Sequence, residues 1–334
     1  MENAGASRRG VLGGAVTGLA IAAAGSATAQ GSGGGAAGTG RLVDPTTEYP
    51  APPFPVQQQP WPGLVSKMNP APDHGESSYR GSGRLAGRKA LITGGDSGMG
   101  RAAAIAYARE GADVAINYLP AEEPDARDVA QLIRAASRKA VTIPGDIREE
   151  AFCERLVADA VAQLGGLDIL VNNAARQVAQ ESILDISTQQ FDDTLKTNLY
   201  AMFWITKAAI PHMRPGSTII NTASVNAYDP GEDIIDYAAT KGAIMIWTKG
   251  LAKQLAKAKK GIRVNAVAPG PIWTPLQVTG GQKPDKLPHF GADTPLGRAG
   301  QPAELAPLYV LLASEESSYS TGQVFGAVGG RGGP

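Results

Sequence analysis

Residues 89–100, KALITGGDSGMG, indicate the fold class of this chain. The first five of these residues form an apolar run typical of a buried strand, and a helical pattern begins at Gly98 and continues to residue 110. The turn between them is rich in glycine, which allows a tight bend and a close approach of a ligand to the backbone. The helix that follows presents N–H groups and the positive end of its dipole, which bind phosphate. The stretch therefore predicts the first strand–turn–helix unit of a dinucleotide-binding sheet.

The same alternation of short apolar runs and helical stretches continues to the C-terminus. Such alternation implies a parallel sheet with helices on both faces. We therefore predict an α/β fold, a single doubly wound Rossmann domain over residues 86–334 with a seven-stranded parallel sheet. The predicted strands are 89–93, 114–117, 140–144, 167–172, 217–222, 262–267 and 323–327, and the predicted helices are 98–110, 125–138, 149–164, 188–212, 234–257 and 302–312.

The N-terminus is typical of an exported protein. Residues 1–29 combine the Arg8-Arg9 pair, an apolar Gly/Ala-rich stretch and small residues that end in a cleavage pattern at Ala29. This is the layout of a twin-arginine signal peptide. The apolar stretch is too short for a good transmembrane helix, so no membrane span is expected after signal removal. We expect a periplasmic or otherwise exported protein, and a cytoplasmic one if the signal is not used.

Residues 30–85 are predicted to form a Gly/Pro-rich linker and N-terminal arm. Phe54, Trp61 and Met68 in this arm are candidates for packing onto the domain or onto a neighbouring subunit. Lys+Arg and Asp+Glu both total 31, so bulk charge gives no support for nucleic-acid binding. No His, Cys and carboxylate cluster has zinc spacing, and we predict no metal site.

Residues at the ends of the other predicted strands complete a candidate cofactor site, because ligands of parallel sheets bind beyond the carboxyl ends of the strands. A Pro-Gly turn after the sixth strand bends the backbone over the same edge. The candidate cofactor-binding residues are Gly94, Asp96, Ser97, Gly98, Met99, Gly100, Asn117, Tyr118, Asp146, Ile147, Asn173, Ala174, Tyr237, Lys241, Pro269, Gly270, Ile272 and Thr274.

The end of the second strand bears on the choice between NADP and NAD. An NAD-specific site usually carries Asp or Glu there, which binds the adenosine 2′-hydroxyl. Asn117 is uncharged and does not repel a 2′-phosphate, so NADP is the preferred expectation. The glycine-rich turn carries no Lys or Arg to hold that phosphate, however, and Asp96 has the wrong sign. NAD therefore stays open, with Arg101 as a candidate helper for NADP.

A second group of polar residues predicts the chemistry. Ser224 follows the fifth strand, and Tyr237 and Lys241, four residues apart, share one face of the helix 234–257. Reduction of a carbonyl needs a proton donor for the oxygen that gains charge as hydride arrives. A free Tyr, with a pKa near 10, is a poor acid at neutral pH, and we expect a nearby ammonium to lower that pKa. Ser224 is expected to bind and orient the substrate oxygen.

These motifs resemble the classical short-chain dehydrogenase/reductase family. The resemblance rests on the TGxxxGxG spacing of residues 93–100, on NNAA at 172–175 and on a catalytic tetrad of Asn198, Ser224, Tyr237 and Lys241. Ala175 stands where the family usually has Gly. The arm and the GGDSG turn resemble the glucose/ribitol dehydrogenase-like branch, which includes general stress and aldehyde reductase proteins.

The resemblance also implies roles and an assembly. Asp146 is expected to bind the adenine amino group and Lys241 the nicotinamide ribose, while Asn198 holds a water that links Lys241 to a proton relay. Ile272 and Thr274 are expected to meet the nicotinamide carboxamide, and residues 275–300, which include His289, to form the substrate lid. Members of this family are usually homotetramers.

The sequence thus predicts an NAD(P)(H)-dependent oxidoreductase that transfers hydride between nicotinamide and a small carbonyl or alcohol substrate, such as an aldehyde, a ketone or a sugar-like compound. Two alternatives stay open. One is an exported dinucleotide-binding structural or sensor protein without turnover, because a periplasm has no obvious route to regenerate NADPH. The other is a sugar-nucleotide epimerase or dehydratase, whose TGxxGxxG spacing and large C-terminal domain this sequence lacks.

Overall fold

The computed structural model describes residues 42–333. Within them, seven parallel strands form one sheet in the order β3-β2-β1-β4-β5-β6-β7. The chain runs outward in opposite directions from β1 and β4, and such a switch point is where doubly wound sheets bind ligands. The predicted fold class is confirmed. The strands are β1 (Lys89–Thr93), β2 (Asp113–Tyr118), β3 (Ala140–Pro144), β4 (Leu167–Asn172), β5 (Met213–Thr222), β6 (Arg263–Pro269) and β7 (Val324–Ala327).

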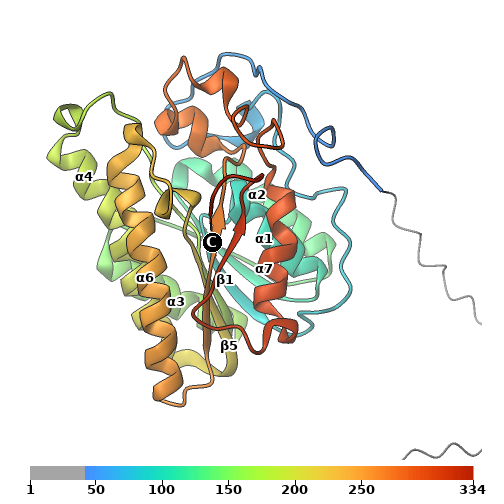
Figure 1. Ribbon diagram of the computed structural model, residues 1–334. Helices are drawn as coiled ribbons and strands as arrows, with labels where there is room; N and C mark the ends of the chain where they lie inside the picture. Colours follow the sequence, from blue (N-terminus) through green and yellow to red (C-terminus); the bar gives the residue numbers. More distant parts are fainter. Residues whose placement is uncertain (1–41, 334) are drawn as a thin grey trace, which may run out of the picture. The chain divides into compact units, whose positions relative to one another are not determined.

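Two layers of helices cover the sheet (Figure 1). One face carries α1, α2 and α7, and the other carries α3, α5 and α6. A hydrophobic core lies between each helix layer and the sheet, and alternate residues of β1 pack into the two cores. Ala90 and Ile92 pack on the α1 side, and Leu91 packs on the α3 side. The helices are α1 (Gly98–Arg109), α2 (Glu123–Ala135), α3 (Glu150–Leu164), α4 (Thr188–Leu195), α5 (Ala201–Ala209), α6 (Ile235–Lys257) and α7 (Pro302–Ala313).

The predicted helix 188–212 is not continuous. α4 ends at Leu195, a π-helical turn covers Lys196–Tyr200, and α5 follows. Hydrophobic periodicity does not reveal such a turn, because one extra residue changes the spacing only locally. β5 likewise begins at Met213 rather than at the predicted 217, since exposed residues interrupt the apolar pattern at its start.

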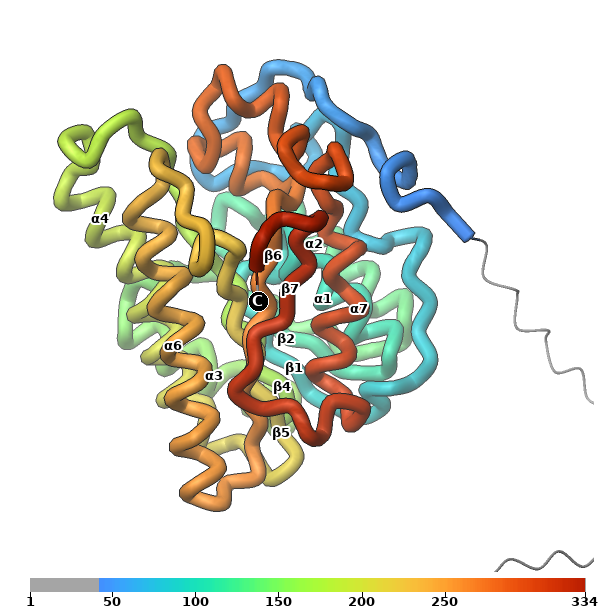
Figure 2. The backbone as a smooth tube through the Cα atoms, in the orientation of Figure 1, coloured from blue at the N-terminus to red at the C-terminus, as the bar shows by residue number. Residues whose placement is uncertain are grey.

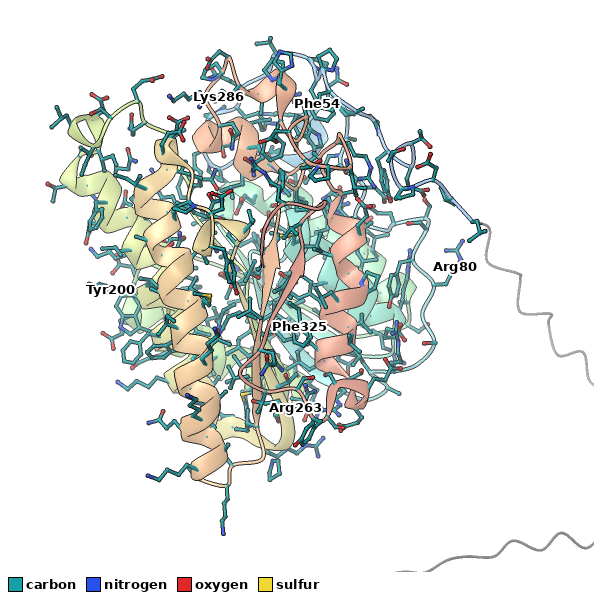
Figure 3. The ribbon with its side chains drawn as sticks, viewed as in Figure 1. Phe54, Arg80, Tyr200, Arg263, Lys286 and Phe325 are labelled. Atoms are coloured by element: carbon teal, nitrogen blue, oxygen red, sulfur yellow. The ribbon has the colours of Figure 1, made fainter. Side chains whose placement is uncertain are left out.

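The arm packs on the lid segment, residues 275–300. Phe54 and Met68 are buried against it, and Phe54 stacks on Trp273 with ring centroids 4.3 Å apart. Trp273 Nε1 also donates to the carbonyl oxygen of Pro70 at 2.8 Å. Figure 2 shows the blue arm and the orange lid segment side by side. In Figure 3, Phe54 and Lys286 lie at one end of the sheet and Arg263, which begins β6, lies at the other, so the arm covers the carboxyl ends of the strands.

Residues 43–85 belong to the same compact unit as the Rossmann domain. The predicted signal peptide, residues 1–29, and the start of the linker lie outside the described residues. Among residues 42–333, no helix has both the length and the hydrophobicity that crossing a bilayer requires.

Candidate active site

The glycine-rich turn after β1 forms a cradle for phosphate. Gly94 has a φ of +60°, a left-handed conformation that favours glycine. An added Cβ on Gly100 would lie 1.9 Å from the carbonyl oxygen of Gly94, so α1 begins directly against the turn. The N–H groups in the first turn of a helix have no partner within that helix. The turn and these N–H groups therefore fit the diphosphate of a dinucleotide.

A cleft of about 980 Å³, including its open mouth, runs from this turn to α6. It joins the glycine-rich turn to Tyr237 and Lys241, which the sequence had placed in separate motifs. The predicted cofactor residues that line it are Gly94, Asp96, Ser97, Gly98, Met99, Asn117, Tyr118, Asp146, Ile147, Asn173, Ala174, Tyr237, Lys241 and Thr274.

Four predicted cofactor residues do not line the cleft. Gly100 lies beneath the turn, and Pro269 ends β6, where it pairs with β7. Gly270 lines a neighbouring cavity instead. The side chain of Ile272 is buried in the core that α1 and α7 share, so only its backbone is left to meet the carboxamide.

Asn117 and Arg101, which were expected at the adenosine ribose, use donor nitrogens in hydrogen bonds within the protein. The Nδ2 atom of Asn117 donates to the carbonyl oxygens of Ile143 and Gly145 at 3.1 and 3.2 Å. Arg101 donates from Nε to Glu76 at 3.0 Å and does not line the cleft. Arg101 is therefore no helper for a 2′-phosphate in this arrangement.

The end of the cleft nearest β2 is instead acidic. Asp96 is 1% exposed, and its Oδ2 has no hydrogen-bond partner among the described residues. Glu122 lines the cleft as well, from the short turn Pro120–Glu122 that follows β2. Burial raises the pKa of Asp96 to about 7, and burial together with the neighbouring Asp96 raises the pKa of Glu122 to about 8. Both groups therefore hold protons close to neutral pH.

Tyr237 and Lys241 line the inner end of the cleft, and Ser224 lies beside Tyr237. The Nζ atom of Lys241 donates to the carbonyl oxygen of Thr222 at 2.7 Å and lies 5.2 Å from the centroid of the Tyr237 ring. Burial raises the pKa of Tyr237 to about 12, against a hydrogen bond with Ser224 that lowers it. Burial lowers the pKa of Lys241 to about 7. Burial thus raises the Tyr237 pKa, whereas the sequence predicted that a nearby ammonium lowers it.

Asn198 lies in the π turn and fixes the backbone that follows β4. Its Oδ1 accepts from the N–H of Arg176 at 2.8 Å, and its Nδ2 donates to the carbonyl oxygen of Arg176 and to Thr240 Oγ1, both at 3.0 Å. Beside it, the buried Oδ1 of Asn172 and Oγ1 of Thr197 have no partner among the described residues and line a small cavity. A polar cavity of this kind suits a water molecule.

A second cavity opens on the other side of Tyr237. It encloses about 1430 Å³, including open solvent, and Ser224 lines it beside the phenol. Gln277 and His289 of the lid segment also line it. The Oε1 atom of Gln277 is buried there without a partner among the described residues. The lid segment therefore borders the space in which a substrate would meet Ser224 and Tyr237.

Comparison with known proteins decides the family. A family model described as Enoyl-(Acyl carrier protein) reductase matches residues 94–331. The uncharacterized oxidoreductase YghA of Escherichia coli is 58% identical over 289 residues, which cover 86% of this chain and 98% of that protein. The chain belongs to the classical short-chain dehydrogenase/reductase family. The family prediction is thereby confirmed.

Two further short-chain dehydrogenase/reductase proteins support its chemistry. The chloroplastic NADPH-dependent aldehyde reductase 1 of Arabidopsis thaliana is 45% identical to this chain. The match covers 82% of this chain and 96% of the Arabidopsis protein. A short chain dehydrogenase from Burkholderia cenocepacia, solved in complex with NADP, has a TM-score of 0.69 at 33% identity and covers 74% of this chain and 98% of its own. The chain is an NAD(P)-dependent oxidoreductase of this family, and nothing in the comparisons supports a protein without turnover.

The short-chain dehydrogenase/reductase cleft also contains residues that the sequence analysis missed. Several of them lie one to four residues beyond the ends of predicted strands. Extending the set of candidate residues by four positions after each strand would have included them. The arm residues carried no such signal, because no strand precedes them. The missed residues are Trp61, Pro62, Gly63, Leu119, Glu122, Gly145, Arg148, Thr197, Thr222, Pro275, Leu276 and Thr279.

Proposed function

We propose that the protein interconverts a small hydroxylated carbonyl compound and its alcohol, with hydride transferred from or to an NAD(P) cofactor. The observation that carries this proposal is the position of Tyr237, which lines both the cofactor cleft and the second cavity. A dinucleotide in the first space and a carbonyl compound in the second would meet at one phenol.

The roles of the residues follow from their contacts. The bound dinucleotide supplies the hydride in reduction. Tyr237, whose pKa burial raises, holds its proton at neutral pH and donates it to the carbonyl oxygen. Ser224 orients that oxygen by a hydrogen bond. Lys241 uses one N–H on Thr222 and retains further N–H donors for ribose hydroxyls.

The lining of the second cavity favours a hydroxylated substrate. Gln277 Oε1 is a buried acceptor without a partner, and Asn226 adds a neutral amide beside Ser224. A buried polar atom without a partner costs about 1–3 kcal/mol, so a substrate hydroxyl that donates to Gln277 gains binding free energy. The Arabidopsis relative is an aldehyde reductase by name. We therefore propose aldehydes with a neighbouring hydroxyl group as the substrate class.

The test follows the oxidation of NADH and of NADPH with glyceraldehyde and with propionaldehyde, which lacks the hydroxyl groups. We expect kcat/KM to be at least about 10-fold higher for glyceraldehyde, because a site that binds a hydroxyl rejects the analogue without it. Tyr237→Phe should lower kcat by roughly 10²–10⁴-fold, with dinucleotide binding retained. Dinucleotide binding without turnover of any carbonyl compound would sink the enzyme proposal, whereas equal kcat/KM values would sink only the substrate class.

We further propose export by the twin-arginine route and assembly into a homotetramer. Support for export comes from the Arg8-Arg9 pair and the small-residue cleavage pattern. Support for assembly comes from apolar side chains that stand exposed on the π turn, α5 and α6, namely Tyr200, Phe203 and Ile246.

A further inference from the structure

The arm forms a closed loop, Gln59 to Leu64, beside the cofactor cleft. The side chain of Gln59 closes it, since its Oε1 accepts from the N–H of Leu64 at 2.8 Å and its Nε2 donates to the carbonyl oxygen of Leu64 at 3.1 Å. The loop carries Trp61, Pro62 and Gly63, and all three line the cleft. Its shape is therefore set by its own hydrogen bonds.

The loop is anchored on both sides of the cleft. The N–H of Gln59 donates to the carbonyl oxygen of Val278 in the lid segment at 2.9 Å. The N–H of Val65, the residue after the loop, donates to Asp125 Oδ2 of α2 at 2.7 Å. An added Cβ on Gly63 would lie 2.5 Å from the Thr279 methyl group, so the loop packs closely on the lid. The loop thus spans the cleft from the lid to α2.

Trp61 lies across the ends of the central strands. Its ring centroid is 4.7 Å from the guanidinium carbon of Arg176 and 5.8 Å from that of Arg148. Arg148 follows β3 and Arg176 follows β4, and β2 and β1 lie between those strands in the sheet. The indole therefore lies over the edge from which the glycine-rich turn emerges.

The Arg148 guanidinium and the Arg176 backbone are held in place, while Arg176 Nε has no hydrogen-bond partner among the described residues. Arg148 pairs with Asp146 and Asp193 at 2.7 and 2.8 Å, and the backbone of Arg176 is fixed by Asn198. Trp61 is nevertheless 38% exposed, so part of this large ring is not covered by protein. A positioned aromatic ring beside a cleft offers a stacking surface for planar rings, and a dinucleotide brings two of them.

We infer that Trp61 is a cofactor-binding residue and that the loop Gln59–Leu64 is the outer wall of the dinucleotide site. The inference rests on dinucleotide binding in the cleft and not on the proposed substrate. Release of the dinucleotide then requires the loop to leave its contacts with Val278 and Asp125. Loss of Trp61 should therefore speed dissociation more than it slows association.

The test uses the full chain and measures Kd and the dissociation rate constant for NADH and NADPH, by fluorescence titration and by stopped-flow displacement. We expect Trp61→Ala to raise both constants on the order of 10-fold. Trp61→Phe, which keeps an aromatic ring, should restore most of the affinity. The matched control is Val56→Ala, because Val56 is an arm residue that is 76% exposed and lines no part of the cleft.

A dissociation rate constant for Trp61→Ala within twofold of wild type would overturn the inference. So would equal changes in Trp61→Ala and Val56→Ala. The thermal unfolding midpoint identifies any variant that loses affinity because it unfolds. If Trp61→Ala unfolds, the affinity of Trp61→Phe decides whether the aromatic ring binds the dinucleotide. Turnover assays distinguish this inference from the proposed function. If Trp61→Ala loses affinity for the dinucleotide but wild type reduces no carbonyl compound, the proposed function is rejected and this inference stands.

Discussion

Burial acts in opposite directions on the two titratable residues of the candidate catalytic group. It raises the pKa of Tyr237 and lowers that of Lys241, because in both cases the charged form loses hydration. At neutral pH the phenol therefore keeps its proton, and the amine carries its charge only in part. This state suits a proton donor for carbonyl reduction. The sequence placed the two residues on one helix face but held no information on their burial.

The acidic end of the cleft leads to a prediction on cofactor choice. Asp96 and Glu122 both line this end of the cleft and interact through their charges, with Asp125 and Arg101 nearby, and their pKa values are raised to about 7 and about 8. At pH 6 both carboxyls are largely neutral, and they gain negative charge as the pH rises through 7 and 8. We expect the ratio of kcat/KM for NADPH to that for NADH to fall roughly 5-fold between pH 6 and pH 9, because the ionised pair repels the 2′-phosphate.

Glu122→Gln should flatten this pH dependence, since it removes one of the two coupled charges. The control is Asp128→Asn, which changes an exposed carboxylate on α2 outside the cleft lining. Steady-state rates with both dinucleotides at each pH provide the measurement. A ratio that stays constant with pH in the wild type would show that the carboxylates do not face the 2′-position.

At the scale of elements, hydrophobic periodicity predicted the regular strands and helices. It did not predict the π turn or the packing of the arm. The strands 89–93, 140–144 and 167–172 were predicted to the residue, because each is a short, mainly apolar run flanked by turn residues. The π turn around Asn198 was missed, since a single inserted residue leaves the pattern nearly unchanged. The packing of the arm was only one of two open options, because Pro-rich sequence has no period that specifies a partner.

The packing of the arm predicts a local effect of one substitution. Phe54 is buried against Trp273, and aromatic-to-alanine changes in buried sites typically cost about 3–5 kcal/mol. We expect Phe54→Ala to detach the arm and to make residues 43–85 the first site of cleavage in limited proteolysis, followed by mass spectrometry. Val56→Ala should behave as wild type. If the arm resists proteolysis equally in both variants, Phe54 is not needed to hold it. Other contacts, such as the hydrogen bond from Trp273 Nε1 to Pro70, are then sufficient.

At the scale of the whole molecule, the proposed twin-arginine signal of residues 1–29 leads to a prediction on location. A twin-arginine substrate crosses the membrane after folding, so the protein could carry a dinucleotide bound beside its arm during transport. We expect a chain with Arg8→Lys and Arg9→Lys to remain in the cytoplasmic fraction, while wild type reaches the periplasm with a shorter N-terminus. Cell fractionation and N-terminal mass spectrometry provide the measurement. Equal distribution of the two chains would reject the export proposal.

The exposed apolar face of α5 and α6 predicts the assembly. Ile246 is 62% exposed on α6, and Tyr200, which Figure 3 shows on the outer side of the same layer, is 46% exposed. A closed symmetric assembly would pair such a face with its copy and bury it.

We expect a tetramer mass by size-exclusion chromatography with light scattering, and a smaller species for Ile246→Lys, because the new ammonium would lose its hydration at the interface. Val56→Lys, an equally polar change on the exposed arm, should leave the mass unchanged. A tetramer that survives Ile246→Lys would place its interfaces elsewhere, and a monomeric wild type would reject the assembly altogether.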